Sequence, residues 1–226
     1  MSGQVHKAYS AVLLAAGSGS RMAADRNKIF LTLADKAIFQ YALDLFLSDS
    51  DCKQVILVGK AEEKNYFTDF LSDRVCFVVG GVERQDSVRH ALAQVSEAAV
   101  MIHDGARPFV TLSELAALKA HNNAILAVPV KDTIKQVEVS GYISQTVPRD
   151  SLWGAQTPQF FETSLIQKVH QLAHSKAFLG TDDASLVEVF SEVPVTIVPG
   201  SYENIKITTP EDLIFGQAIL DNRSKA

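Results

Sequence analysis

The feature that most constrains the fold is a regular alternation of short apolar runs with segments of helical periodicity. Short continuous apolar runs are typical of strands buried on both faces of a sheet. They occur at residues 10–16, 54–59, 75–81, 98–104, 123–130 and 193–200. Between several of them, apolar residues recur at helical spacing, at residues 38–46, 88–95 and 115–118. Because parallel strands need crossover connections, this alternation predicts a mostly parallel sheet with helices on both faces.

Further helices are expected towards the C-terminus, at residues 162–173 and 182–190 and after Thr209. Thr209 is a suitable N-cap because Pro210 and then two acidic residues follow it. The chain of 226 residues, 47% of them hydrophobic, is large enough to bury a substantial core. We therefore expect one Rossmann-like α/β domain over residues 1–226.

The pattern changes at residue 131, where two polar strands flank a tight turn at Ser140-Gly141. This predicts a protruding β-hairpin arm at about residues 131–150. An isolated two-stranded hairpin is marginally stable in water. A second copy of the chain is therefore the expected support, which predicts a homodimer.

The net charge of −5 argues against nucleic-acid or anionic-membrane partners, both of which favour a basic surface. No segment is long enough to span a bilayer, and the first apolar run is too short for a signal peptide. Cys52 and Cys76 lack metal-ligand spacing, so we interpret them as reduced thiols of a cytoplasmic protein. Lys119 is expected on a solvated face.

The first apolar run leads into a glycine-rich, basic loop, "AAGSGSRMAADRNKIF". It lacks the Gly-Lys-Ser/Thr of a P-loop, and Met22 stands where the dinucleotide fingerprint requires its third Gly. A dehydrogenase is therefore disfavoured. Gly17 and Gly19 would let backbone N–H groups surround phosphate oxygens, with Arg21 and Lys28 adding positive charge. On this motif alone, a phosphate-binding nucleotidyltransferase loop and a solvated turn remain alternatives.

Two other motifs follow predicted strands. Asp104 ends the run at 98–104, which positions a carboxylate at the ligand-binding edge of a parallel sheet, where it could hold Mg²⁺ or cap a turn. We interpret the neighbouring His103 as a half-buried structural residue. Gly80 and Gly81 permit close approach of a flat ligand, and Ser87 could donate to it. Further along, Asp182 and Asp183 resemble first-turn helix acids, with a second metal contact left open.

Together these motifs resemble the 2-C-methyl-D-erythritol 4-phosphate cytidylyltransferases of the non-mevalonate isoprenoid pathway. The matching stretches run in order from about Ala11 to about Leu213: "AAGSGSRM…NKIF", "GGVERQDSV", "HDGARPFV", "AVPVKDTIK", "VPRDSLWGAQTPQFF", "TDDASLVE" and "NIKITTPEDL". The resemblance implies Mg²⁺-dependent transfer of a cytidylyl group from CTP to a sugar-alcohol phosphate, with release of pyrophosphate. It also implies that the hairpin arm interlocks with a second subunit.

The resemblance further implies residue roles. The residues that contact CTP would be Ala15, Ala16, Gly17, Gly19, Gly81 and Ser87. Asp104 would help to hold the metal. The catalytic cations would be Arg21, Lys28, Arg149 and Lys206, of which the last two would also grip the acceptor phosphate together with Arg107 and Thr133. Thr133 and Arg149 would serve the neighbouring subunit's site if the arm is exchanged.

Two positions depart from the family pattern. The family commonly has Pro-Lys-Gln where this chain has Asn27-Lys28-Ile29, and often has Asp where this chain has Val82. Neither departure removes a charge that the chemistry requires. The alternative within the same class is a ribitol-5-phosphate cytidylyltransferase, which shares the glycine loop, "QTP" and "NIK". A non-catalytic nucleotide-binding regulator is less favoured because Arg21, Lys28 and Asp104 are all present.

Overall fold

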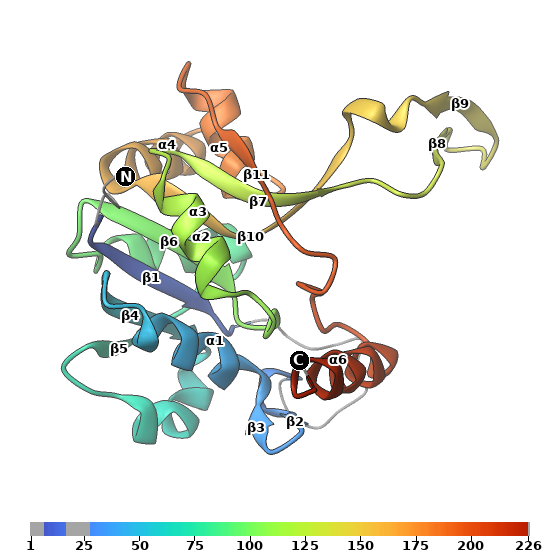
Figure 1. Ribbon diagram of the computed structural model, residues 1–226. Helices are drawn as coiled ribbons and strands as arrows, with labels where there is room; N and C mark the ends of the chain where they lie inside the picture. Colours follow the sequence, from blue (N-terminus) through green and yellow to red (C-terminus); the bar gives the residue numbers. More distant parts are fainter. Residues whose placement is uncertain (1–6, 17–27, 226) are drawn as a thin grey trace, which may run out of the picture.

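The computed structural model describes residues 7–16 and 28–225, with only the backbone of Lys28. In this part of the chain, a seven-stranded sheet has the order β11-β7-β10-β6-β1-β4-β5 (Figure 1). The strands are β1 Tyr9–Leu14, β4 Cys52–Gly59, β5 Val75–Val79, β6 Ala99–Asp104, β7 Ala124–Pro129, β10 Trp153–Glu162 and β11 Thr196–Pro199. Neighbouring strands pair in parallel, apart from β10. The predicted mostly parallel sheet is confirmed.

β10 is antiparallel to both of its neighbours, β6 and β7, and the apolar pattern did not predict it. Pro158 and the polar Gln156 and Gln159 interrupt the run of apolar residues that marks the other central strands. The register shifts between Ala155 and Gln159. Gln159 is nevertheless buried. Its side-chain amide donates to Asp182 and accepts from the backbone N–H of Ala184. These tertiary hydrogen bonds allow a polar residue in a buried strand, which the apolar pattern alone would not predict.

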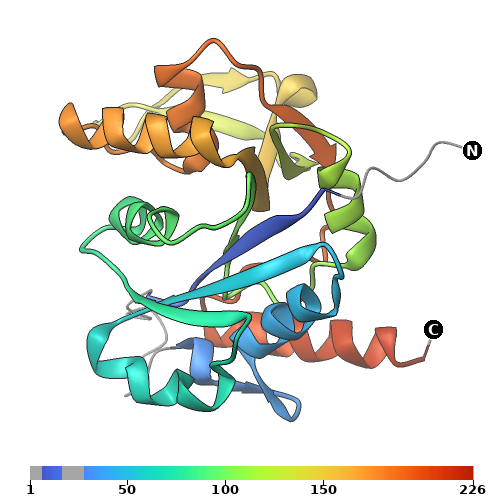
Figure 2. The ribbon, with the colours of Figure 1, turned by 90° about the vertical axis from the view of Figure 1, so that its left-hand side faces the viewer.

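Helices cover both faces of the sheet (Figure 2). Ala11 and Leu13 of β1 point to the core shared with α1 Ile38–Ser48, the 3-10 helix η3 Ala61–Phe70 and α3 Leu112–Lys119. Val12 points to the opposite core, which α2 Arg84–Leu92, α4 Thr163–Ser175 and α5 Asp183–Phe190 complete. Successive side chains of a strand face opposite sides of the sheet, so one apolar run contributes side chains to both cores.

The segment of residues 200–209, here called the strap, connects β11 to α6 Pro210–Arg223. Ile207 is fully buried in the strap, and its N–H donates to the carbonyl of Ala106 at 2.8 Å. Thr209 is the N-cap of α6, and Asp212 accepts from the N–H groups of Thr208 and Thr209. This confirms the predicted helix start. The short hairpin β2 Thr32–Leu33 and β3 Lys36–Ala37 lies beside α6.

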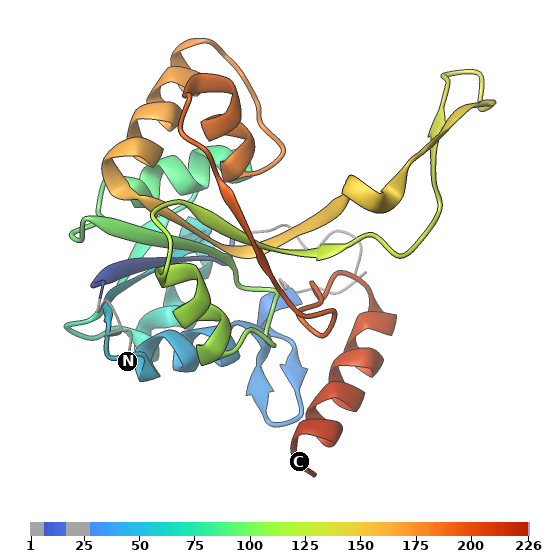
Figure 3. The same ribbon diagram turned by 45° about the horizontal axis from the view of Figure 1, so that its top comes forward.

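The predicted hairpin is formed by β8 Ile134–Val137 and β9 Ile143–Val147, with Gly141 at a positive φ of 85° in the turn. It extends away from the sheet (Figures 1 and 3). Val139, Tyr142 and Ile143 are exposed on it. Over the described residues, no helix combines the length and the apolar character needed to cross a membrane.

The prediction for Lys119 was wrong. Its ammonium group lies 2.8 Å from Asp49 and 2.6 Å from Asp51, and the side chain is only 11% exposed. The hydroxyl of Tyr9, at the start of β1, donates to the same Asp49. The amphipathic pattern of α3 did not reveal these partners because they lie about 70 residues earlier in the chain.

Candidate active site

The backbone brings together the carboxyl ends of β1, β5 and β6. The N–H of Gly105 donates to the carbonyl of Leu14 at 2.8 Å, which joins the ends of β6 and β1. Gly80, after β5, packs so closely that an added Cβ would lie 2.9 Å from Cβ of Ala16 and 2.8 Å from Oγ of Ser87. Three sequence motifs therefore meet at one edge of the sheet, which is where ligands bind in such folds.

The loop before α2 is built around Gly81 and Ser87. The N–H of Gly81 donates to Oγ of Ser87 at 3.0 Å, and the Ser87 hydroxyl donates to the carbonyl of Glu83 at 3.1 Å. A Cβ at residue 81 would lie 2.3 Å from Cβ of Asp86, so only glycine fits this turn. Val82, at the departure from the family pattern, is 96% exposed.

Asp104 is buried at the end of β6 and is surrounded by cations. One carboxylate oxygen lies 2.8 Å from Nζ of Lys206 and 3.9 Å from Nε of Arg107, while the other lies 3.3 Å from Nε of Arg84. Two of these cations, Arg107 and Lys206, are residues that the sequence assigned to acceptor binding. The structure thus joins them to the predicted metal residue.

The electrostatics of Asp104 follow from these neighbours. Burial alone would raise the pKa of Asp104, but the charges of Arg84, Lys206 and Arg107 outweigh burial and hold the pKa well below its usual range. Burial lowers the pKa of the Arg107 guanidinium more than Asp104 raises it. With Asp183, which also pairs with Arg84, the cluster carries two carboxylates and three cations, so one positive charge remains in excess.

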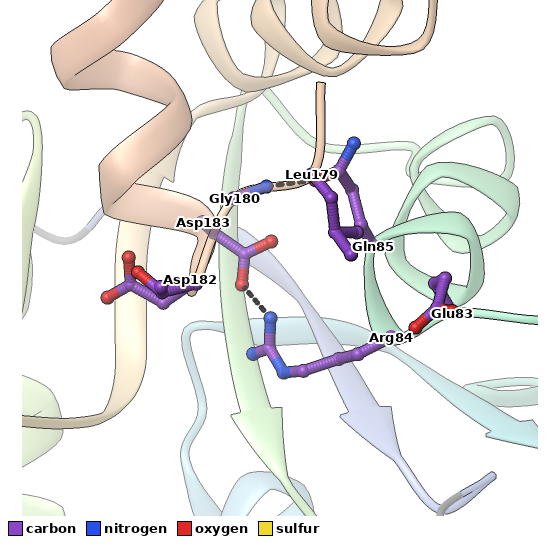
Figure 4. Close-up of a pocket in the computed structure, with 8 residues that line it drawn as sticks. Glu83, Arg84, Gln85, Leu179, Gly180, Asp182 and Asp183 are labelled. Carbon is purple, nitrogen blue, oxygen red and sulfur yellow. Dashed lines mark hydrogen bonds and ion pairs between the residues drawn. The ribbon is translucent and has the colours of Figure 1, made fainter. Parts of the chain in front are cut away.

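Arg84 is a residue that the sequence reasoning missed. It is the first residue of α2, where the helix dipole disfavours a cation, and that position was the available signal that it has specific partners. Its Nη1 lies 2.8 Å from Asp183 at the start of α5 (Figure 4). Beside this ion pair is a pocket of about 100 Å³, lined by residues 83–85 and 179–183. Arg84 therefore joins Asp104 to α5.

Asp182 and Asp183 begin α5 and have different partners. Asp182 is the N-cap and accepts from the N–H of Ser185 at 2.9 Å. Asp183 is buried and accepts from Arg84 and from Nε2 of His170, at 3.1 Å. Burial raises the pKa of Asp183, but Arg84 and His170 outweigh it and lower the pKa overall. Both acids thus serve the helix start and its ion pair, in line with their interpretation as first-turn acids.

His103 is fully buried rather than half-buried, which corrects the sequence interpretation. Nε2 lies 2.9 Å from the carbonyl of Arg107, and Nδ1 lies 3.0 Å from Oγ1 of Thr157 on β10. Burial lowers the pKa of His103 to about 4, so the imidazole is neutral at physiological pH. The apolar residues before His103 indicated a strand, but they did not indicate that the polar His103 and Asp104 at its end are buried as well.

Among the described residues, Thr133 and Arg149 make no hydrogen bond or ion pair with the Asp104 cluster. Thr133 and Arg149 are exposed at the base of the arm, and the Arg149 guanidinium donates to the carbonyl of Lys131. Gly17, Gly19 and Arg21 lie outside the described residues. For Lys28 only the backbone is described, at the start of the 3-10 helix Lys28–Phe30.

Within residues 7–16 and 28–225, no three His, Cys, Asp or Glu side chains are grouped so that they could hold a metal ion. Asp104 is a hard oxygen donor, but its oxygens face three protein cations. Such a site does not suit a metal held by protein ligands alone. Asp104 can contribute one oxygen to a divalent cation whose other ligands come from elsewhere.

Several known proteins of one family are similar to this chain. A family model described as IspD: 2-C-methyl-D-erythritol 4-phosphate cytidylyltransferase matches residues 9–222. The cytidylyltransferase of that name from Bacillus velezensis is 45% identical over 226 residues, covering 96% of this chain and 97% of its own. A 4-diphosphocytidyl-2C-methyl-D-erythritol synthase crystal structure from Anaerococcus prevotii has a TM-score of 0.83 and 31% identity. The alignment covers 96% of this chain and 97% of that one.

Proposed function

Because this chain belongs to the 2-C-methyl-D-erythritol 4-phosphate cytidylyltransferase family, we propose that the edge of the sheet around Asp104 transfers a cytidylyl group from CTP to 2-C-methyl-D-erythritol 4-phosphate. The observation that carries the assignment to this edge is the convergence of Arg84, Arg107 and Lys206 on Asp104. An excess of fixed cations is what a reaction between two phosphorylated molecules requires.

The nucleotide would lie against the loops that end β1 and β5. Ala16 adjoins Gly80, and the Gly81–Ser87 turn, held by a hydrogen bond, offers close backbone approach to a base. The triphosphate would then extend to residues 17–28, with Gly17 and Gly19 near its oxygens. Arg21 and Lys28 would stabilise the charge that develops on it.

The reaction is an in-line displacement. A phosphate monoester is largely ionised at neutral pH, since its second pKa is near ~6, so the acceptor oxygen needs no protein base. That oxygen forms a bond to the α-phosphorus of CTP while the bond from the α-phosphorus to the bridging oxygen breaks, and pyrophosphate leaves with the electron pair. The barrier is dominated by repulsion between the two anions and by the charge on the leaving group.

The acceptor phosphate would be held by Arg107, Lys206, Thr133 and Arg149. Lys206 is 40% exposed, so its ammonium group can leave Asp104 for a substrate oxygen. Nε of Arg107 is buried without a hydrogen-bond partner among the described residues, which suits a donor reserved for an anion. Lys206 and Arg149 would also stabilise the transition state.

Asp104 would supply one oxygen to a Mg²⁺ ion that enters with the triphosphate. Such an ion would neutralise further charge on the phosphates as a Lewis acid. Arg84 would keep the Asp104 carboxylate oriented when Lys206 moves to the substrate, because it bonds to the other oxygen.

The active form would be a homodimer joined by the arm of residues 131–150, with the rest of the 226 residues as one nucleotidyltransferase domain. The exposed Val139, Tyr142 and Ile143 supply the apolar contact surface for a partner arm. Thr133 and Arg149 would then reach the partner's site. Both cysteines are free, in keeping with a cytoplasmic protein.

The test is pyrophosphate release from CTP and Mg²⁺ with 2-C-methyl-D-erythritol 4-phosphate or with ribitol 5-phosphate as the acceptor. We expect release with the first acceptor and a much lower kcat/KM with the second. Equal or preferential use of ribitol 5-phosphate would refute the acceptor assignment, and release with neither would refute the proposed function.

A further inference from the structure

Four residues from three separate segments form a closed ring of hydrogen bonds beneath the Asp104 cluster. His103 bonds through Nε2 to the carbonyl of Arg107 at 2.9 Å and through Nδ1 to Oγ1 of Thr157 at 3.0 Å. The side-chain amide of Asn204, in the strap, donates to the carbonyl of Thr157 at 2.9 Å. The ring closes where Nη1 of Arg107 donates to the carbonyl of Asn204 at 2.6 Å.

The direction of every bond in this ring is determined. The carbonyl of Arg107 can only accept, so Nε2 of His103 carries the proton and Nδ1 must accept. The hydroxyl of Thr157 therefore donates to Nδ1. Its oxygen is left free to accept from the backbone N–H of Asp104, which lies at 3.0 Å. A proton on Nδ1 instead would leave Nε2 and the carbonyl of Arg107 facing each other as two acceptors, so the contact at Arg107 determines the tautomer.

We propose that His103 is a positioning residue for the transfer reaction: it fixes the loop of residues 104–107 against β10 and the strap, and so sets the spacing of Arg107 and Lys206 around Asp104. This inference rests on the proposed function. His103 itself touches no substrate; it acts through Thr157, Asn204 and the backbone. Lys206 follows Asn204 by two residues, so the ring determines where the strap presents its ammonium group.

Stability alone does not account for a buried polar ring. Replacing both partners of a buried hydrogen bond by apolar groups of the same shape is often nearly neutral for stability. Apolar packing could therefore hold β6, β10 and the strap together here. Directional bonds add a defined geometry, and a displacement of about 1 Å at a phosphoryl-transfer site can cost on the order of 10²-fold in rate.

The test compares His103→Phe, which keeps the ring volume but loses both bonds, with His103→Asn, whose Oδ1 retains an acceptor near Nδ1. Thr157→Val and Thr157→Ser form a second pair that removes or keeps the hydroxyl. Tyr9→Phe is the control, because it removes a buried hydroxyl bond to Asp49 at the opposite end of the sheet. Each variant is assayed for kcat, for KM of both substrates and for Tm.

We expect kcat/KM for the acceptor to fall on the order of 10²-fold in His103→Phe. The loss should be smaller in His103→Asn, and Thr157→Ser should restore what Thr157→Val loses. Tyr9→Phe should lower Tm while leaving kcat and KM unchanged. Wild-type kcat and KM in His103→Phe would overturn the proposal. If that variant does not fold, equal kinetics in the two Thr157 variants would overturn it.

A second measurement is independent of the proposed reaction. The ¹⁵N chemical shifts of His103 in the free protein should report the neutral tautomer with its proton on Nε2. A proton on Nδ1 would contradict the ring. Wild-type pyrophosphate release distinguishes the two failures: if it is absent, the proposed function fails, whereas release that is unaffected by the His103 and Thr157 variants refutes only the positioning role.

Discussion

At the scale of single residues, the site depends on one carboxylate with three competing cations. Asp104 balances part of the charge of Arg84, Arg107 and Lys206 in the free protein. Phosphate groups would compete for Arg107 and Lys206, while Arg84 remains engaged with Asp183 on its other side. A residue predicted from sequence as a metal ligand is thus also the anchor that orders the cations before substrate arrives.

Lys206→Met should lower kcat on the order of 10²–10³-fold, by analogy with the loss of one oxyanion-hole donor. Methionine keeps much of the stem, and the side chain is 40% exposed, so Tm should change little. Lys168→Met, on the exposed side of α4, is the matched control and should leave kcat unchanged. A rise in acceptor KM at constant kcat would show that Lys206 contributes only to binding.

Mg²⁺ alone should not bind the protein measurably, because Asp104 already faces three cations and Asp183 is paired with Arg84 and His170. With CTP present, binding should become Mg²⁺-dependent. Isothermal titration with Mg²⁺ alone, with CTP alone and with both checks this directly. Tight binding of Mg²⁺ to the free protein would contradict a role for substrate phosphates in holding the ion.

At the scale of elements, Arg84 joins the starts of α2 and α5 to the end of β6. Asp183 is buried, so removing its cation leaves a charge without full compensation, at a cost on the order of 3 kcal/mol. Arg84→Met should therefore lower the free energy of unfolding. The double variant with Asp183→Asn should lose less than the sum of the single variants, as measured by urea unfolding. Additive losses would mean that the pair is not coupled.

The pH dependence of stability follows from the same pair. The folded pKa of Asp183 lies below its unfolded value of about 3.9. Its contribution is therefore complete above that pH and is lost as the pH falls towards the folded pKa. The destabilisation caused by Asp183→Asn should be largest at pH 7 and shrink below about pH 4. Asp221→Asn, on the exposed face of α6, is the control. A pH-independent difference would contradict this assignment.

The elements that could be predicted from the sequence are those with a local sequence signal. Apolar runs predicted the parallel strands, Thr209 and Pro210 predicted the start of α6, and the Ser140-Gly141 turn predicted the hairpin. β10 was missed because its buried polar residues have distant partners: those of Gln159 lie at the start of α5, about 25 residues later, and that of Gln156 lies in the strap. Arg84 was missed because its partner Asp183 lies 99 residues away. Local patterns specify elements, whereas the charge network depends on contacts that only the folded chain brings together.

At the scale of the whole molecule, the arm raises the question of which subunit completes each site. Thr133 and Arg149 make no hydrogen bond or ion pair with the Asp104 cluster of the same chain within the described residues. An exchanged arm would bring them to the partner's cluster. The four exposed apolar residues Val137, Val139, Tyr142 and Ile143 on a two-stranded hairpin agree with a buried position in an assembly.

Mixed dimers test this exchange. If Arg149 serves the partner's site, a dimer of one Arg149→Ala subunit and one Lys206→Met subunit contains one intact site and one site with both defects. Such purified dimers should show about half of wild-type activity, since a twofold dimer has two equivalent sites. If Arg149 serves its own subunit, each site carries one defect, and activity should stay at the level of the single variants.

A crystal structure of the protein with CTP and Mg²⁺ would show directly where the nucleotide binds. We expect the base between Ala15–Ala16 and the Gly81–Ser87 turn, with the triphosphate directed to residues 17–28 and Mg²⁺ on the phosphates beside Asp104. A nucleotide bound away from the ends of β1, β5 and β6 would contradict this expectation.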